Sequence, residues 1–166
     1  IMKKILLALL VLPFISCTGP TNPNYEKNLA TAQKIFTLHG EENLEAQLAL
    51  LSEDMTMEPA TYGSKTLNKE AFGDLLKGYH MAFDEINFEA NVWLPGTDEQ
   101  GDLNGSVRTY GTWTGVSAST GIRLNLKSYH FFNFNAEGLI QQQGDFFDAT
   151  GMMNATSIQE PVNTEE

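Results

Sequence analysis

The stretch IRLNLKSYHFFNF, from Ile122 to Phe134, decides the fold. Every second side chain in it falls on one face, and that face is apolar apart from a serine and a histidine. Its members are Ile122, Leu124, Leu126, Ser128, His130, Phe132 and Phe134. A period of two over this length indicates a long β-strand with one face turned to a core.

Further strands are expected on both sides of this one. Residues 87–94 alternate in the same way, and we predict that Phe88, Ala90, Val92 and Leu94 face inward. After a loop at 95–105 that is rich in Gly, Asp and Asn, a strand is expected at 106–113 and a turn at 114–121. A tight turn at 135–138 then leads to a last strand at 139–148.

The part of the chain before these strands has the period of helices. Tyr25, Leu29, Ala32 and Phe36 are spaced by four, three and four residues, behind Asn24 as a cap. A second, shorter helix is expected at 44–51, then a brief strand at 55–58 and a third helix after the capping residue Asn68. Helices followed by a meander predict an α+β domain, with three N-terminal helices packed on a curved antiparallel sheet.

The start of the chain has the pattern of an export signal. Lys3 and Lys4 precede an apolar run that is too short to span a bilayer and ends at Ser16, just before Cys17. Residues 14–17 resemble the lipobox of bacterial lipoproteins. We therefore expect a signal peptide at 1–16, a lipidated Cys17 with a linker at 17–24, a domain at 25–155 and an acidic tail at 156–166. The expected location is the bacterial cell envelope, on the periplasmic or surface side. A plain secretory cleavage near Ser16 and an uncleaved anchor are the alternatives.

Composition excludes several classes of function. The chain has a formal net charge of −11 and its single cysteine is Cys17, so the domain has no internal disulfide. Such acidity argues against nucleic acid and anionic lipid headgroups as partners of the protein surface. There is no phosphate-binding glycine loop, nucleophile elbow or paired-cysteine motif, and the three histidines are too far apart for a local metal motif. We expect neither a metal nor a cofactor.

Three short motifs carry a family resemblance. They are FDEINF at 83–88, GTWTG at 111–115 followed by TG at 120–121, and GLI at 138–140 followed by Asp148. Together with the order of elements, they resemble the SnoaL-like group of the nuclear transport factor 2-like superfamily over residues 25–155. The resemblance implies a cone-shaped fold with a pocket between sheet and helices, and a homodimer formed through the sheet.

The most informative candidate for chemistry is His130. On the apolar face of its strand it is expected to point into the cone, as an acid or base, as a donor to a ligand, or as a buried structural histidine. The last strand supplies the carboxylate. If Ile140 faces inward, strict alternation sends Asp148 inward, and if Leu139 does, Asp145 is the inward acid. The resemblance favours Asp148, although one bulge reverses that choice.

Other side chains are expected to line the pocket: Trp113, Tyr79, His80 and Phe132. His39, at the end of the first helix, is interpreted as structural. The leading hypothesis is a membrane-tethered domain that binds a small apolar or aromatic molecule. The alternative is a cofactor-independent lyase, isomerase or hydrolase that uses His130 with Asp148 or Asp145, as the resemblance to SnoaL-type cyclases implies. A second alternative is a dimerisation or docking module without catalysis.

Overall fold

The computed structural model describes residue 22 and residues 24–157. The predicted signal peptide, Cys17 and most of the acidic tail lie outside the described residues. Nine elements follow one another along the chain: α1 (Tyr25–Gly40), α2 (Leu44–Ala49), β1 (Leu51–Glu58), α3 (Lys69–Ala82), β2 (Phe83–Thr97), β3 (Leu103–Ser117), β4 (Arg123–Phe134), β5 (Ile140–Phe147) and α4 (Ala149–Thr156).

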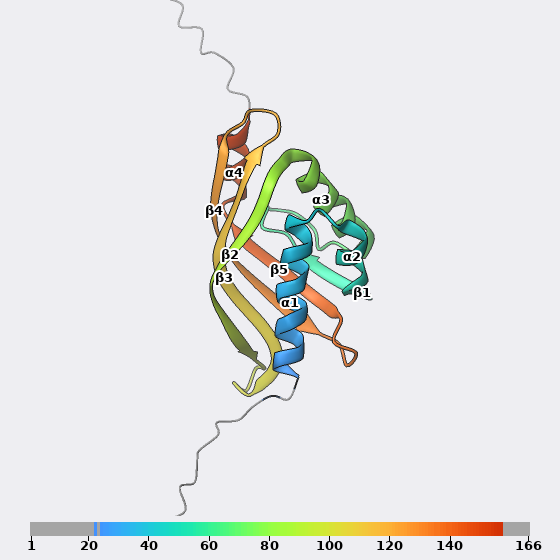
Figure 1. The fold of residues 1–166 in the computed structure, drawn as a ribbon. Coiled ribbons are helices and arrows are strands. Elements are labelled where there is room, and N and C mark those ends of the chain that lie inside the picture. Colours follow the sequence, from blue (N-terminus) through green and yellow to red (C-terminus); the bar gives the residue numbers. More distant parts are fainter. Residues whose placement is uncertain (1–21, 23, 158–166) are drawn as a thin grey trace, which may run out of the picture.

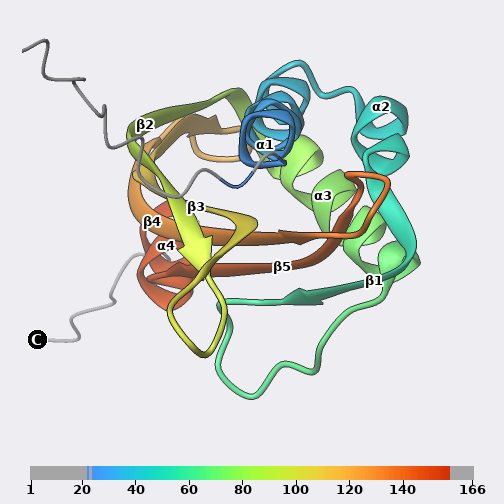
Figure 2. The ribbon, with the colours of Figure 1, turned by 90° about the horizontal axis from the view of Figure 1, so that it is seen from below.

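The strands form one strongly curved sheet in the order β1-β5-β4-β3-β2. Figures 1 and 2 show α1, α2 and α3 on one side of this sheet, which bends around them. The predicted α+β class, three N-terminal helices and antiparallel meander are confirmed for β2 to β5. β1 differs, because it starts earlier than expected and pairs in parallel with β5. Its first half was missed because residues 52–54 are polar and Leu51 was assigned to the preceding helix.

The core lies between the concave face of the sheet and the helices α1 and α3. Phe36 of α1, Phe72 of α3 and Phe132 of β4 are buried there beside Met55 and Met57 of β1. Leu126, Ser128, His130 and Phe132 are all buried, which confirms the predicted inward face within β4. Ile122 precedes the strand and is 40% exposed, so the prediction that it shares this face is wrong. Truncating a buried phenylalanine such as Phe132 to alanine costs about 3–5 kcal/mol of stability, so this packing fixes the inner wall of the cone firmly.

A bulge in β2 changes which of its side chains face the core. The pairing with β3 shifts between Ala90 and Val92, so alternation reverses there. Val92 and Leu94 are therefore exposed on the convex face, whereas Trp93 packs against the core. The prediction that Val92 and Leu94 face inward is wrong, because a period count cannot detect one extra residue.

The chain ends, within its described part, in the short helix α4, which the sequence analysis did not predict. The side chain of Asp148 caps this helix by accepting a hydrogen bond of 2.8 Å from the backbone N–H of Gly151. Among the described residues, no helix is long and apolar enough to cross a membrane.

Candidate functional site

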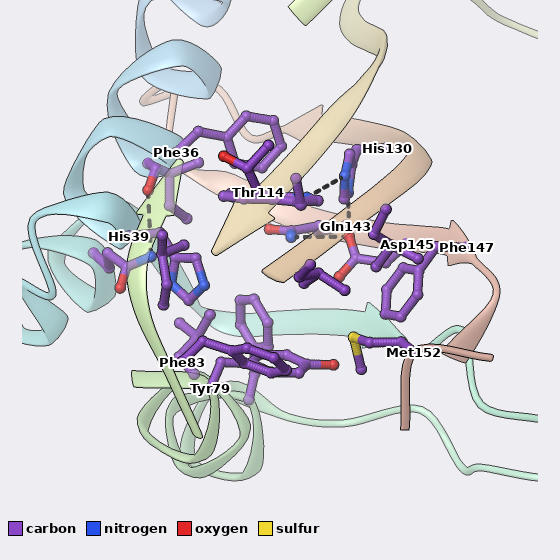
Figure 3. A pocket seen from close by; sticks show the side chains of 18 residues that line it. Phe36, His39, Tyr79, Phe83, Thr114, His130, Gln143, Asp145, Phe147 and Met152 are labelled. Carbon is purple, nitrogen blue, oxygen red and sulfur yellow. Dashed lines mark hydrogen bonds and ion pairs between the residues drawn. The ribbon is translucent and has the colours of Figure 1, made fainter. Parts of the chain in front are cut away.

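A cavity opens between the concave face of the sheet and helices α1 and α3 (Figure 3). Its volume is about 720 Å³ including its mouth. That is room for a few waters or one small organic molecule. Its apolar lining consists of Ile35, Phe36, Phe72, Leu76, Phe83, Ile86, Leu124, Leu126, Phe147 and Met152, and its polar lining of His39, Gln47, Tyr79, Trp113, Thr114, His130, Gln143 and Asp145.

His130 occupies the sheet wall of this cavity and is 2% exposed. Its Nδ1 lies 2.7 Å from Oδ1 of Asp145, which faces it from the paired position on β5. Its Nε2 lies 2.9 Å from Nε1 of Trp113 and 2.9 Å from the hydroxyl of Ser128. Every hydrogen-bonding position of this imidazole is therefore occupied by a neighbour (Figure 3).

Trp113 determines which ring nitrogen of His130 carries the proton. The indole N–H only donates, so Nε2 of His130 must accept and the proton sits on Nδ1, which donates to Asp145. The imidazole is consequently neutral in this arrangement, and its lone pair is already engaged. His130 is placed to orient Asp145 rather than to take a proton from a ligand.

Asp145 is the carboxylate that reaches the cavity, and a bulge explains why. Ile140 pairs with Phe134 and Gln142 with Asn133, so Gln141 is an extra residue that reverses the alternation along β5. Ile140 and Asp145 thus both face inward. The preference for Asp148 is wrong, because that side chain is exposed and caps α4.

Gln143 stands beside Asp145 on the same face of β5 and is 4% exposed. Its Nε2 lies 3.3 Å from Oδ1 of Asp145. A carboxylate oxygen accepts, so this contact turns the amide N–H₂ of Gln143 toward Asp145 and its Oε1 away. That Oε1 is buried and has no hydrogen-bond partner among the described residues.

The helical wall opposite carries a second histidine. His39 of α1 lies against the cavity, and its Nδ1 is 2.8 Å from Nε2 of His80 on α3. Burial, and to a lesser extent the neighbouring His80, lowers the pKa of His39 to about 4. His39 is therefore neutral near pH 7.

Tyr79 joins the main cavity to a second one. A neighbouring cavity beneath the segment 59–67 shares Tyr79, Asp145 and Phe147 with the first. Burial, with a smaller effect of the Asp145 charge, raises the pKa of Tyr79 to about 12, so its hydroxyl stays protonated. Asp145 thus lies where the two cavities meet.

The expected set of pocket residues is brought together only in part. Trp113, Tyr79, His130 and Asp145 line the cavity. Phe132 instead belongs to the packed core, and His80 stands behind His39, so neither is among the lining residues. The sequence analysis missed Gln143 and the inward role of His39. The glutamine was hidden by the bulge, while the helix period places His39 three residues after Phe36, on the same face.

Several solved structures share the fold of this chain. No family model and no curated protein matches the chain. A solved structure from Bacillus subtilis, provisionally assigned as an isomerase, has a TM-score of 0.69 at 20% identity, over 84% of this chain and 100% of that one. One from Shewanella denitrificans, provisionally assigned as a SnoaL-like polyketide cyclase, has a TM-score of 0.64 at 13% identity, over 78% and 96%. The epoxide hydrolase/cyclase-like enzyme SalBIII has a TM-score of 0.63 at 19% identity, over 75% and 93%. The described domain therefore has the same fold as these proteins, the nuclear transport factor 2-like fold.

Proposed function

We propose that this domain binds a small, largely apolar molecule in its central cavity and anchors the polar group of that molecule on Asp145. The observation that carries the proposal is the cavity itself: its lining is mostly apolar, with one carboxylate in a polar corner. Ligand sites commonly combine an apolar wall with a few placed polar groups. The fold hosts both binders and enzymes, so the proposal rests on the site rather than on the fold.

Blocking the cavity tests this proposal. Leu124 lines the cavity and is half-buried, so a tryptophan at this position fills space without displacing the deep core. The neutral dye N-phenyl-1-naphthylamine is expected to bind the wild type with a fluorescence increase. Leu124→Trp is expected to weaken that binding at least tenfold. Met81→Trp, at an exposed position outside the cavity lining, is the matched control and should leave dye binding unchanged. Equal dye affinity in Leu124→Trp and wild type would overturn the proposal.

A second candidate function is proton transfer by Asp145. The 2.7 Å contact with His130 favours it, because a carboxylate held at one oxygen keeps the other available to a ligand. The neighbours in fold that are named as cyclases or assigned as an isomerase add support. In this scheme Asp145 takes a proton from an activated C–H or O–H of the ligand, and His130 is a positioning residue. The step requires no redox change, and the same carboxyl group returns the proton.

Deuterium exchange tests this second candidate. Small carbonyl compounds are incubated with the protein in D₂O, and the loss of C–H signals is followed by NMR. Asp145→Asn keeps the shape of the side chain and removes its basic oxygen, so exchange should stop while dye binding is kept. Exchange that persists in Asp145→Asn, or no exchange with any compound by the wild type, would contradict the candidate.

A lipid tether at Cys17 is proposed from the sequence of residues 1–17. Such an anchor would hold the binding domain close to a membrane in the bacterial cell envelope. Metabolic labelling with radioactive palmitate is expected to mark the wild type and not Cys17→Ser. Labelling of both proteins would rule out a lipid on Cys17.

Self-association through the sheet is also proposed, and the convex face supports it. Val92, Tyr110, Tyr129 and Phe146 occupy paired positions on four neighbouring strands, and the ring of Tyr129 lies against those of Tyr110 and Phe146. Tyr110 is 51% and Phe146 52% exposed, which is uncommon for side chains of this size. Light scattering of the wild type and Tyr110→Glu is expected to show a dimer and a monomer. A monomeric wild type at high concentration would contradict the proposal.

A further inference from the structure

The charges around the cavity differ from those of a site for acidic metabolites. Among its 18 lining residues there is one carboxylate, Asp145, and no lysine or arginine. The Asp145 side chain is 13% exposed. Its only ion-pair contact among the described residues is with His130. Since that imidazole donates from Nδ1 and accepts at Nε2, it contributes a hydrogen bond and no positive charge.

The second histidine of the cavity supplies no positive charge either. His39 is held neutral near pH 7 by its burial, with a pKa of about 4. Tyr79 is protonated and therefore also neutral. The wall of the cavity thus carries one negative charge in surroundings that are mostly hydrocarbon. An uncompensated charge in such a place favours a ligand of the opposite sign.

The hydrogen-bonding groups at this corner are acceptors. Oδ2 of Asp145 accepts no hydrogen bond from the described residues, and neither does Oε1 of Gln143. The nearby donors are already used: the Trp113 N–H is bonded to His130, and the His130 N–H is bonded to Asp145. The hydroxyl of Tyr79, which also lines the cavity, can both donate and accept, whereas an ammonium group brings donors only and matches the free carboxylate oxygen of Asp145.

Aromatic rings complete the site. Trp113, Tyr79, Phe36 and Phe83 line the same cavity as Asp145, and Figure 3 shows Tyr79 across the cavity from that carboxylate. The faces of such rings attract cations. The protein as a whole also has a formal net charge of −11, which draws cationic molecules toward its surface.

We infer that the ligand of the cavity is a protonated amine on an apolar body, with its ammonium group hydrogen-bonded to Asp145. The inference rests on the proposed binding function and names its ligand class. Carboxylates and phosphates are excluded from the main cavity by the same charge. Lys65 lines the adjoining cavity, is exposed and makes no ion pair with Asp145, so an acidic ligand is the competing outcome that a test must include.

Three probes with one apolar body separate these outcomes: 2-phenylethylamine, 2-phenylethanol and 3-phenylpropionate. Each is titrated at pH 7 against the complex of the full-length protein with N-phenyl-1-naphthylamine. The amine is expected to displace the dye at concentrations at least tenfold lower than the alcohol, and the carboxylate to be weaker still.

Asp145→Asn is expected to abolish the advantage of the amine over the alcohol and to keep dye binding, because the two side chains have nearly the same shape. Asp148→Asn is the matched control. It removes the same charge three residues away, outside the cavity, and asparagine still caps α4. The amine should keep its full advantage in that variant.

Several results would overturn the inference. They are an alcohol or carboxylate that competes as well as the amine, an amine that does not displace the dye, or an advantage that survives in Asp145→Asn. In all of these cases, dye binding that is lost in Leu124→Trp would still support a small-molecule site. Dye binding that is indifferent to Leu124→Trp is a failure of the proposed function itself.

Discussion

The two histidines of the cavity lie on opposite walls and have different hydrogen-bond partners. His130 of β4 and His39 of α1 are 2% and 7% exposed, and the shortest polar contact of each is with a side chain from another element. The partner of His130 is the carboxylate Asp145, whereas the partner of His39 is another imidazole, His80. Since burial is similar, the difference in partner decides the chemistry of the two walls.

The consequence is a polar corner on the sheet and a neutral wall on the helices. At the sheet, three side chains hold one another in a single arrangement, with Trp113 donating to His130 and His130 donating to Asp145. At the helices, His39 and His80 share one contact, and both have a lowered pKa because of burial. A buried histidine is therefore informative about function only once its partner is known.

The largest expected loss of stability comes from replacing His130, the histidine of the sheet wall. His130→Leu leaves the Asp145 carboxylate and the Trp113 N–H without their partner in a largely buried place. Leaving a buried group without its hydrogen-bond partner typically costs about 1–3 kcal/mol, and more for a charged group, so the free energy of unfolding should fall by about 3 kcal/mol. His39→Leu should cost about 1 kcal/mol, because His80 is only half-buried and can bond to water instead. Urea denaturation at pH 7 measures both.

The double variant His130→Leu/Asp145→Leu distinguishes the loss of the hydrogen bond between these two side chains from the loss of packing contacts. It removes both polar partners together, so most of the lost stability is expected to return. A His130→Leu variant no less stable than His39→Leu would mean that the two walls are equivalent, contrary to the geometry.

The next effect concerns pH and the helical wall. The pKa of His39 is about 4 in the folded protein and near 6.5 in the unfolded chain, so between these values the unfolded state binds a proton that the folded state does not. Stability therefore falls as the pH is lowered from about 6.5 to 4, by at most about 3 kcal/mol. The smaller lowering at His80 acts in the same direction.

His39→Leu removes this contribution and should flatten the decline in that window. Urea midpoints at pH 7, 5.5 and 4.5 for the two proteins give the measurement. Parallel declines in both proteins would show that His39 is not the group that resists protonation.

The sequence predicts the frame of this site better than its details. Alternation along 122–134 places His130 on the inner wall, because nothing interrupts the pairing of β4 with β3. The two errors of facing, at Val92 and at Asp148, both follow a single-residue bulge. A bulge depends on how two strands pair, and that is not visible in the periodicity of either strand alone.

The partners of the histidines were also beyond the sequence. Trp113 and His130 are seventeen residues apart and meet because β3 and β4 pair, while His39 and His80 meet across two helices. His39 was interpreted as a helix-end residue from its position, although its spacing from Phe36 already placed it on the inward face. The period of a helix identifies a face, but only the packed structure shows that this face borders a cavity.

The smallest expected effect on stability comes from replacing Trp113, which donates a hydrogen bond to His130. Trp113→Phe removes the one N–H that obliges Nε2 of His130 to accept, and the loss of a buried hydrogen bond costs about 1 kcal/mol. The matched control is Trp93→Phe, which truncates a half-buried tryptophan on the same core that makes no bond to His130. Trp113→Phe should therefore lower stability in urea by about 1 kcal/mol more than Trp93→Phe.

Only Trp113→Phe is expected to alter the imidazole of His130 in ¹⁵N NMR at pH 7. In the wild type and in Trp93→Phe, one nitrogen should give the signal of a protonated Nδ1 and the other that of an acceptor. Without the indole, Nε2 can carry a proton and donate to the Ser128 hydroxyl, so a positively charged ring beside Asp145 becomes allowed. That charge would offset the carboxylate and reduce the preference of the cavity for a protonated amine. An unchanged spectrum would mean that Ser128 and Asp145 fix the tautomer of His130. Trp113 would then have no part in keeping the imidazole neutral beside the Asp145 carboxylate.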